Sequence, residues 1–402
     1  MTIAIHHTRL IDGTGAVLDH ATLLVRGSKI TAVGSSRDIT IPKGAIRIDG
    51  RGLTVIPGLI DCHVHLCLGG EPDVVATVKS EPPSYTLLKS AQHAKMTIEA
   101  GFTTVRDVGS RDYSVFALKR AIESGILPGP RIVAAGLVIC MIGGHARFIG
   151  QEVNGTKQVR QAVAAQVAAG AGVIKVIASG GVLTPGTSPA QAQMTIEELS
   201  AAVDAARRAE KKVAAHAHAA SGMKNAIQAG VHSIEHATLM DDATGELMKK
   251  RGVYMVPTLS ALATAAARRP GCGVPESVLD KAKSMTKRHH ASFKKAHRSG
   301  ILIAMGTDAG TPFNHHGENA QELERMVMLG MTPMEAIVAS TAAAARLIGI
   351  QHSVGALEEG MQADIVVIDG NPLRRIEFLR DRSRIMGVMQ GGRFVAGPLA
   401  EC

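Results

Sequence analysis

Side chains that could bind a metal ion recur in this sequence near the ends of short apolar runs. They are His63 and His65 in the run 54–65, His216 and His218 in 212–219, His236 in 232–239, and Asp308 in 302–310. Residues two apart on a strand point to one face, so His63 and His65 could hold a single ion at about 2.0–2.1 Å. One such pair is weak evidence for a metal site. Histidine or aspartate side chains near the ends of four separate runs, however, predict one.

A lysine inside another apolar run adds a second kind of chemistry. Lys175 lies in "GVIKVIASGG", residues 172–181, between β-branched neighbours typical of a strand that is covered on both faces. A buried amine has a lowered pKa and is partly neutral, so it can add carbon dioxide and become a carbamate. The carbamate is a carboxylate-like anion suited to bridging two cations. In the simpler alternative only the stem is buried and the ammonium reaches water; the converging histidines and aspartate favour the carbamate.

Eight apolar runs must position these side chains. Predicted strands cover 54–65, 102–109, 131–139, 172–181, 212–219, 232–239, 253–259 and 302–310. Helix-like segments separate them, and Thr195 and Thr332 each begin one, with a glutamate three residues on to complete a capping box. Eight strand–helix units predict an α/β fold, a (β/α)8 TIM barrel over 55–355, whose active site lies at the carboxyl ends of the strands.

The flanks, residues 1–54 and 356–402, have a different pattern of short alternating strands separated by turn residues. Examples are "ATLLVRGSKITAVG" and "RIMGVMQGGRFVAG". Neither flank is long enough to bury a comfortable core alone. We therefore expect the two flanks to pair into one small composite β-sandwich domain beside the barrel.

Composition argues against several classes of partner. The chain has 402 residues, 46% of them hydrophobic, yet no apolar run approaches the ~18 residues of a membrane span. Much of the net charge of +9 lies in residues 249–298, where basic and apolar positions interleave as on an outer helix. Aromatic residues that could stack on bases make up only 2% of the chain. We expect neither a membrane nor a nucleic acid as partner.

Cysteine usage and the start of the sequence bear on location. The five cysteines are scattered and odd in number: Cys62, Cys67, Cys140, Cys272 and Cys402. They fit a reducing compartment better than a disulfide framework, and "MTIAIHHTRLIDG" lacks the features of a secretory signal. We predict a cytoplasmic protein.

Several motifs together resemble the amidohydrolase superfamily. They are "PGLIDCHVHL", the lysine of the fourth strand, "AHAH", "IEHA", "GTDAG" and the tail "GALEEGMQADIVVIDGNPL". The most similar branch is the imidazolonepropionase-related group, which includes prolidase-like (Xaa-Pro) and arginine-carboxypeptidase-like dipeptidases. The resemblance implies a (β/α)8 barrel with a composite β-sandwich, a centre of two divalent ions, usually zinc, and a homo-oligomer.

The same resemblance implies a ligand set. His63, His65 and Asp308 would hold the first ion, His216 and His236 the second, and the Lys175 carbamate (N6-carboxylysine) would bridge both. Spacing alone leaves His216 and His218 equally placed on their strand. The resemblance favours His216, which makes His218 a neighbour of the site or a core residue.

The predicted reaction is hydrolysis of the amide bond of a small dipeptide or N-acyl amino acid. A hydroxide shared by the two ions would attack, with Asp308 as general base and then general acid. His145 and Tyr254 are candidates for contacting the scissile carbonyl, and Arg147 for pairing with a substrate carboxylate. Otherwise His145 is a loop residue, Tyr254 a core aromatic and Arg147 a surface residue.

Two other functions stay open. The same centre could open a cyclic amide or cleave a xenobiotic amide, carbamate or urea. A barrel kept as a non-catalytic scaffold would lack some of the ligands, whereas every expected ligand position is filled here.

Overall fold

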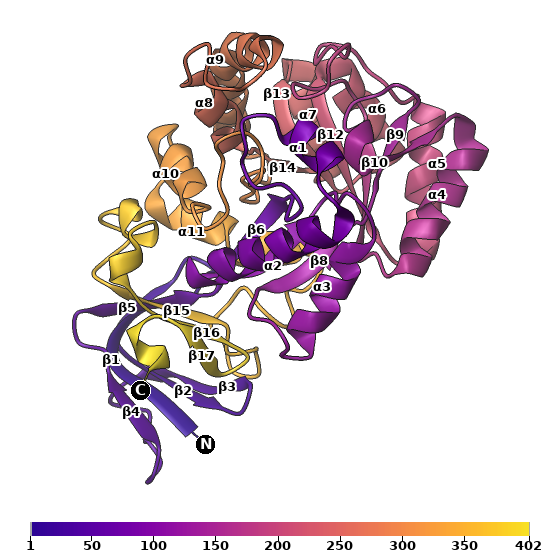
Figure 1. The fold of residues 1–402 in the computed structure, drawn as a ribbon. Helices are drawn as coiled ribbons and strands as arrows, with labels where there is room; N and C mark the ends of the chain where they lie inside the picture. Colours follow the sequence, from indigo (N-terminus) through magenta and orange to yellow (C-terminus); the bar gives the residue numbers. More distant parts are fainter. Residues whose placement is uncertain (1, 402) are drawn as a thin grey trace.

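The computed structural model describes residues 2–401, whose strands lie in three sheets (Figure 1). One sheet joins strands from both ends of the chain, and the other two are parallel sheets with helices between successive strands. The predicted α/β class is confirmed by this arrangement. Met1 and Cys402, the outermost residues of the predicted flanking domain, lie outside the described part.

The flanks share one eight-stranded sheet, where the indigo and yellow ends of the ribbon meet (Figure 1). Its strands are β1 (Thr2–Ile11), β2 (Val17–Arg26), β3 (Lys29–Ser35), β4 (Ile46–Asp49), β5 (Leu53–Pro57), β15 (Ile365–Asp369), β16 (Ile385–Gln390) and β17 (Arg393–Ala396). Antiparallel pairing of β15 with β5 sets Val367 opposite Val55. Both valines belong to an apolar cluster that also contains Ile5 and Leu23, so residues from the two ends of the chain bury one core.

The two parallel sheets carry the runs that hold the candidate ligands, except the run 302–310. One has the order β6 (Leu59–Val64), β7 (Phe102–Asp107), β8 (Arg131–Ala134). The other has the order β10 (Gly150–Val153), β9 (Val138–Met141), β11 (Val173–Ile177), β12 (Lys212–Ala219), β13 (Ser233–Leu239), β14 (Tyr254–Val256). Every residue of β6, β7 and β11 is buried, as expected for parallel strands that are covered on both faces.

Three predicted strands differ in detail from the observed ones. The run 54–65 divides at Pro57 and Gly58, so that β5 joins the flanking sheet and β6 the parallel one. The run 131–139 divides into β8 and β9 around Gly136, whose φ of 75° breaks an extended strand. The run 302–310 contacts its neighbours through single bridges, Ile303 to Met255 of β14 and Ala309 to Val64 of β6.

Twelve α-helices are described. They are α1 (Val74–Ser80), α2 (Pro83–Glu99), α3 (Ser114–Glu123), α4 (Gly155–Ala169), α5 (Ile196–Arg208), α6 (Ala220–Ala229), α7 (Asp242–Arg251), α8 (Leu259–Ala266), α9 (Glu276–Arg298), α10 (Gln321–Met328), α11 (Pro333–Ala339) and α12 (Ala342–Ile348). Both predicted capping boxes are present, at the start of α5 and of α11. The basic helix α9 buries an apolar face that includes Leu279 and Phe293, as predicted. Within residues 2–401, no helix has the length and apolarity needed to cross a membrane.

Candidate metal centre

The first group of potential ligands joins β6 to the run 302–310. His63 is the second-last residue of β6, and His65 directly follows the strand. The backbone N–H of Asp308 donates to the carbonyl oxygen of His63 at 2.7 Å. The Nε2 atoms of His63 and His65 each lie 3.4 Å from Asp308 Oδ1. All three residues are buried, and their ligand atoms lie within 4.8 Å of one another. This group has the composition and spacing of a metal site.

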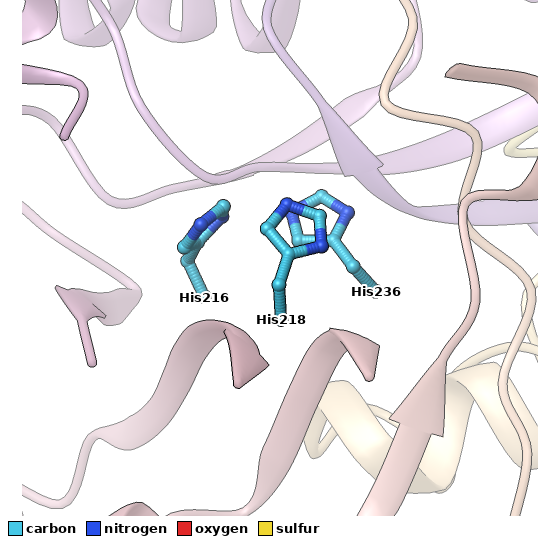
Figure 2. Close-up of side chains that lie close together, drawn as sticks. All are labelled: His216, His218 and His236. Carbon is cyan, nitrogen blue, oxygen red and sulfur yellow. The ribbon is translucent and has the colours of Figure 1, made fainter. Parts of the chain in front are cut away.

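The second group comes from the adjoining strands β12 and β13. Figure 2 shows His216, His218 and His236 with their rings turned toward one another, and one nitrogen of each lies within 4.8 Å of the others. The structure therefore places His218 as a third potential donor beside the two predicted ones. The rings of His63 and His236 are 5.1 Å apart between centroids, so the two groups adjoin.

Lys175 lies at the middle of β11 and lines the same cavity as both groups. Its side chain is 2% exposed, and its Nζ atom has no hydrogen-bond partner within residues 2–401. Burial lowers its pKa to about 8, although Glu235 and Asp308 act in the opposite direction. A buried amine without a partner, next to imidazole and carboxylate donors, fits a carbamate that bridges divalent ions. Imidazole nitrogens and carboxylate oxygens are also the donors that zinc accepts.

A buried ion pair orients His63. The Nδ1 atom of His63 lies 2.7 Å from Glu235 Oε2, and Arg106 Nη2 donates to both oxygens of Glu235 at 2.9 and 3.0 Å. Burial alone would raise the pKa of Glu235, but Arg106 and Lys175 outweigh it and hold the pKa at about 2. The ionised Glu235 accepts the Nδ1–H of His63, so the Nε2 lone pair of His63 is free for an ion.

The remaining histidines are oriented by neutral partners. Nδ1 of His65 donates to the Gly109 carbonyl oxygen at 2.8 Å, and Nδ1 of His236 lies 2.6 Å from Thr258 Oγ1. Nδ1 of His218 likewise lies 2.8 Å from Thr238 Oγ1. In His216 the other ring nitrogen is used, and its Nε2 lies 3.3 Å from the carbonyl oxygen of Gly180. Each ring is thus held through one nitrogen, and the other nitrogen is left as a ligand atom.

Backbone strain concentrates at the same strand ends. His236 and Asp308 have φ values of 71° and 60°, and Thr258, which contacts His236, has a φ of 52°. Residues other than glycine rarely adopt this left-handed region, and it costs them roughly 1–3 kcal/mol each. Such strain persists where the surroundings impose it, which is typical of functional sites.

The cavity above the two groups has a volume of about 70 Å³. Apart from the candidate ligands, its lining is mostly apolar: Leu68, Val138, Ala146, Phe148, Ile149, Ile177, Val182, Leu183, Ala261, Leu262, Ala265, Val278 and Pro312. His145 also lines it, and its ring centroid lies 4.5 Å from that of His216. Burial lowers the pKa of His145 to about 3, so this imidazole is neutral at physiological pH.

Two predicted substrate contacts are corrected by the structure. Tyr254 is the first residue of β14, opposite Ser233, and lines a separate depression with Lys212 and Arg251. The strand was identified correctly, but the cavity lies at the other end of the parallel strands. Arg147 is exposed and its Nη1 donates to the Gly143 carbonyl oxygen at 3.0 Å, so it does not reach the cavity.

Sequence reasoning missed the residues that orient the ligands. Glu235 stands in "IEHA" directly before His236, and Arg106 stands inside the apolar run 102–109. The argument applied to Lys175, a charge within a buried strand, would have identified Arg106 too. His289 of α9 is 1% exposed because it belongs to the buried face of that helix.

Two adjoining groups of potential metal ligands share one cavity with a buried amine that has no hydrogen-bond partner within residues 2–401. Together with the parallel strands, they define an α/β protein with a candidate metal centre. The model of the amidohydrolase family matches residues 54–395, and the chain belongs to this family. The predicted resemblance is therefore confirmed, and so is the prediction of an enzyme that acts on amide bonds. Members of this family generally use divalent metal ions.

Individual relatives agree with this assignment. Ochratoxinase of Aspergillus niger is 32% identical over 422 aligned residues, which cover 97% of this chain and 85% of the relative. Imidazolonepropionase of Rubrobacter xylanophilus is 25% identical, with 94% of this chain and 91% of the relative covered. A crystal structure of a Xaa-Pro dipeptidase with methionine bound in its active site superposes with a TM-score of 0.91 at 37% identity, covering 99% of this chain and 100% of that one.

Proposed function

We propose that this enzyme hydrolyses an amide bond of a small molecule at a centre of two divalent ions. The ligands would be His63, His65 and Asp308 for one ion, His216 and His236 for the other, and the Lys175 carbamate between them, with His218 available as a further donor. The observation that carries the proposal is the buried Lys175 amine, which has no partner within residues 2–401 and lines the same cavity as both donor groups.

Carbamate formation on Lys175 follows from its environment. The neutral amine attacks carbon dioxide, an N–C bond forms, and one proton leaves to solvent. A pKa of about 8 leaves an appreciable neutral fraction at physiological pH, since an ordinary lysine has a pKa near 10.5. The product carries a negative charge, which the cationic neighbours of an occupied centre would stabilise.

In the proposed reaction the chain's own residues move the protons. The ions, when bound, polarise the scissile carbonyl and lower the pKa of a water molecule toward about 7. Burial opposes ionisation of Asp308, but His63 and His65 outweigh it and hold its pKa well below the usual range. Asp308 is therefore ionised before the reaction, takes a proton from the attacking water, and returns it to the leaving amine.

His145 is proposed to stabilise the oxygen of the scissile carbonyl. The hydroxyl of Thr184 accepts the Ala146 N–H at 3.0 Å and lies 2.9 Å from His145 Nδ1, to which it can donate its own proton. That arrangement leaves the proton of the neutral imidazole on Nε2. A neutral donor of this kind typically contributes about 2.7–4 kcal/mol to the stabilisation of an oxyanion.

Dipeptides and N-acyl amino acids are the first candidate substrates, since the similar structures include a Xaa-Pro dipeptidase. A second class, neutral amides, carbamates or ureas with a bulky apolar group, is favoured by the cavity itself. Its lining, within the described part of the chain, contains no arginine and one lysine, the Lys175 assigned to the bridge. A buried carboxylate without a cationic partner is costly, whereas an apolar group gains from burial.

Metal analysis and a substrate panel test the proposal together. Protein purified from zinc-supplemented cells should contain about two ions per chain, and a chelator should abolish turnover. Leucylproline and N-benzoylphenylalanine represent the carboxylate class, and propionanilide and a phenylurea the neutral class. Absence of bound ions would refute the proposed centre, and the preferred half of the panel would decide between the substrate classes.

We also propose that the two parallel sheets form one closed (β/α)8 barrel over 55–355 beside a domain built from 1–54 and 356–402. On one side, the bridges of the run 302–310 link β6 to β14. On the other, the N–H of Gly172, just before β11, donates at 2.8 Å to the carbonyl oxygen of Ala134, the last residue of β8. Both contacts support closure. The homo-oligomeric state and the cytoplasmic location stay predictions.

A further inference from the structure

A lysine outside the metal centre holds a loop at the edge of the cavity. Lys281 lies on α9, and its Nζ atom is 2.9 Å from the carbonyl oxygen of Thr187, 3.4 Å from that of Gly181 and 3.5 Å from that of Thr184. Within residues 2–401, no carboxylate lies within ion-pair distance of this amine. An ammonium that bonds three carbonyl groups of one loop fixes the path of that loop.

The loop 181–187 is also the support of His145. The Thr184 side chain bonds both the imidazole Nδ1 of His145 and the N–H of Ala146. Gly181 lies against the tip of the same imidazole, where a Cβ atom would collide with the ring. Two of the three carbonyls that Lys281 binds therefore belong to residues that contact His145.

The helix that carries Lys281 is itself anchored. Leu279 and Phe293 of α9 are buried, and Val278 lines the cavity. Val182, within the loop, packs in the same apolar cluster as Val278 and Leu279. Apolar packing holds the loop against the helix but does not fix the orientation of its peptide groups. The three hydrogen bonds of the amine are directional, so they set that orientation.

We infer that Lys281 is a positioning residue, which orients His145 through the loop 181–187. The inference rests on the role proposed above for His145 at the scissile carbonyl. Loss of the amine would leave the metal ligands in place but let the loop and the imidazole move. Stabilisation of the transition state would weaken more than substrate affinity, because an oxyanion donor acts mainly on the transition state.

The test compares Lys281→Met with two matched variants in the metal-loaded enzyme. Lys281→Met should lower kcat by about ten- to a hundredfold, with KM changed by less than about threefold. Lys281→Arg, which keeps a long cationic donor, should recover part of the loss. Lys283→Met removes an exposed lysine of the same helix and should behave as the wild type. Amide hydrogen exchange of residues 181–187 should accelerate in Lys281→Met and stay at the wild-type rate in Lys283→Met.

His145→Gln separates the possible failures. If it lowers kcat and the double variant with Lys281→Met is no slower, the inference is supported. If His145→Gln lowers kcat while Lys281→Met leaves both kcat and loop exchange unchanged, the inference alone is overturned. If His145→Gln retains full kcat, the proposed role of His145 fails and the inference fails with it. Should Lys281→Met not fold, Lys281→Gln decides by the same two measurements.

Discussion

Removal of the charge on Glu235 should weaken metal binding, although Glu235 is not itself one of the proposed metal ligands. In Glu235→Gln the carboxylate that accepts from His63 Nδ1 at 2.7 Å becomes a neutral amide. Loss of such an orienting partner typically lowers metal affinity by about 10- to 100-fold. That change corresponds to about 1.4–2.7 kcal/mol of binding free energy at 25 °C.

The same substitution leaves Arg106 without its counter-charge. Arg106 and Glu235 are 1% and 0% exposed, so the guanidinium loses its carboxylate partner in the interior. An uncompensated buried charge of this kind costs about 3–5 kcal/mol of folding stability. Metal affinity and stability should thus fall together in Glu235→Gln, and a second variant is needed to separate them.

The double variant Arg106→Met/Glu235→Gln provides that separation. Because both charges are gone, its unfolding free energy should recover toward the wild-type value, whereas its metal affinity should stay low. Zinc titration against a competing chelator measures the affinity, and denaturant unfolding of the metal-free protein measures the stability. Glu197→Gln, the same change at an exposed position, is the control. Wild-type zinc affinity in Glu235→Gln would refute the role assigned to the ion pair.

Three further outcomes are expected. Lys175→Met should fold but bind fewer than two ions and lose activity by at least about a hundredfold, and metal analysis with a turnover assay checks this; retention of two ions would contradict the bridge. Tyr254→Phe should leave kcat and KM within about twofold of the wild type, because Tyr254 lies at the end of β14 that faces away from the cavity. A tenfold loss of kcat would instead support the predicted contact of Tyr254 with the scissile carbonyl. Burial raises the pKa of Glu322 to about 7 from 4.5, so the folded state binds more protons than the unfolded state between these values. The contribution of Glu322 to the unfolding free energy should therefore fall as the pH rises from 4.5 to 7, and Glu322→Gln should remove that contribution from a pH series of denaturant melts; a slope equal to that of the wild type would contradict the assignment.

The sequence by itself determined which strands carry the chemistry and which residue types stand near their carboxyl ends. A period of two gives His63 and His65 a common face whatever surrounds them. The capping boxes at Thr195 and Thr332 are equally local, because donor and acceptor lie within four residues. The lysine within β11 signalled a special environment because an unpaired buried charge is costly anywhere in a fold.

Only the tertiary structure decided which residues meet. His218 joins His216 and His236 because β12 and β13 lie side by side, which spacing along one strand cannot show. Tyr254 falls away from the cavity because its position along β14, not its strand, sets which end of the sheet it reaches. Arg106 and Glu235 are 129 residues apart in the chain, yet they form the pair that orients His63. The spacing of residue types along the chain indicates local secondary structure and which residues share a face. Contacts such as these depend on strand register and on packing between distant segments.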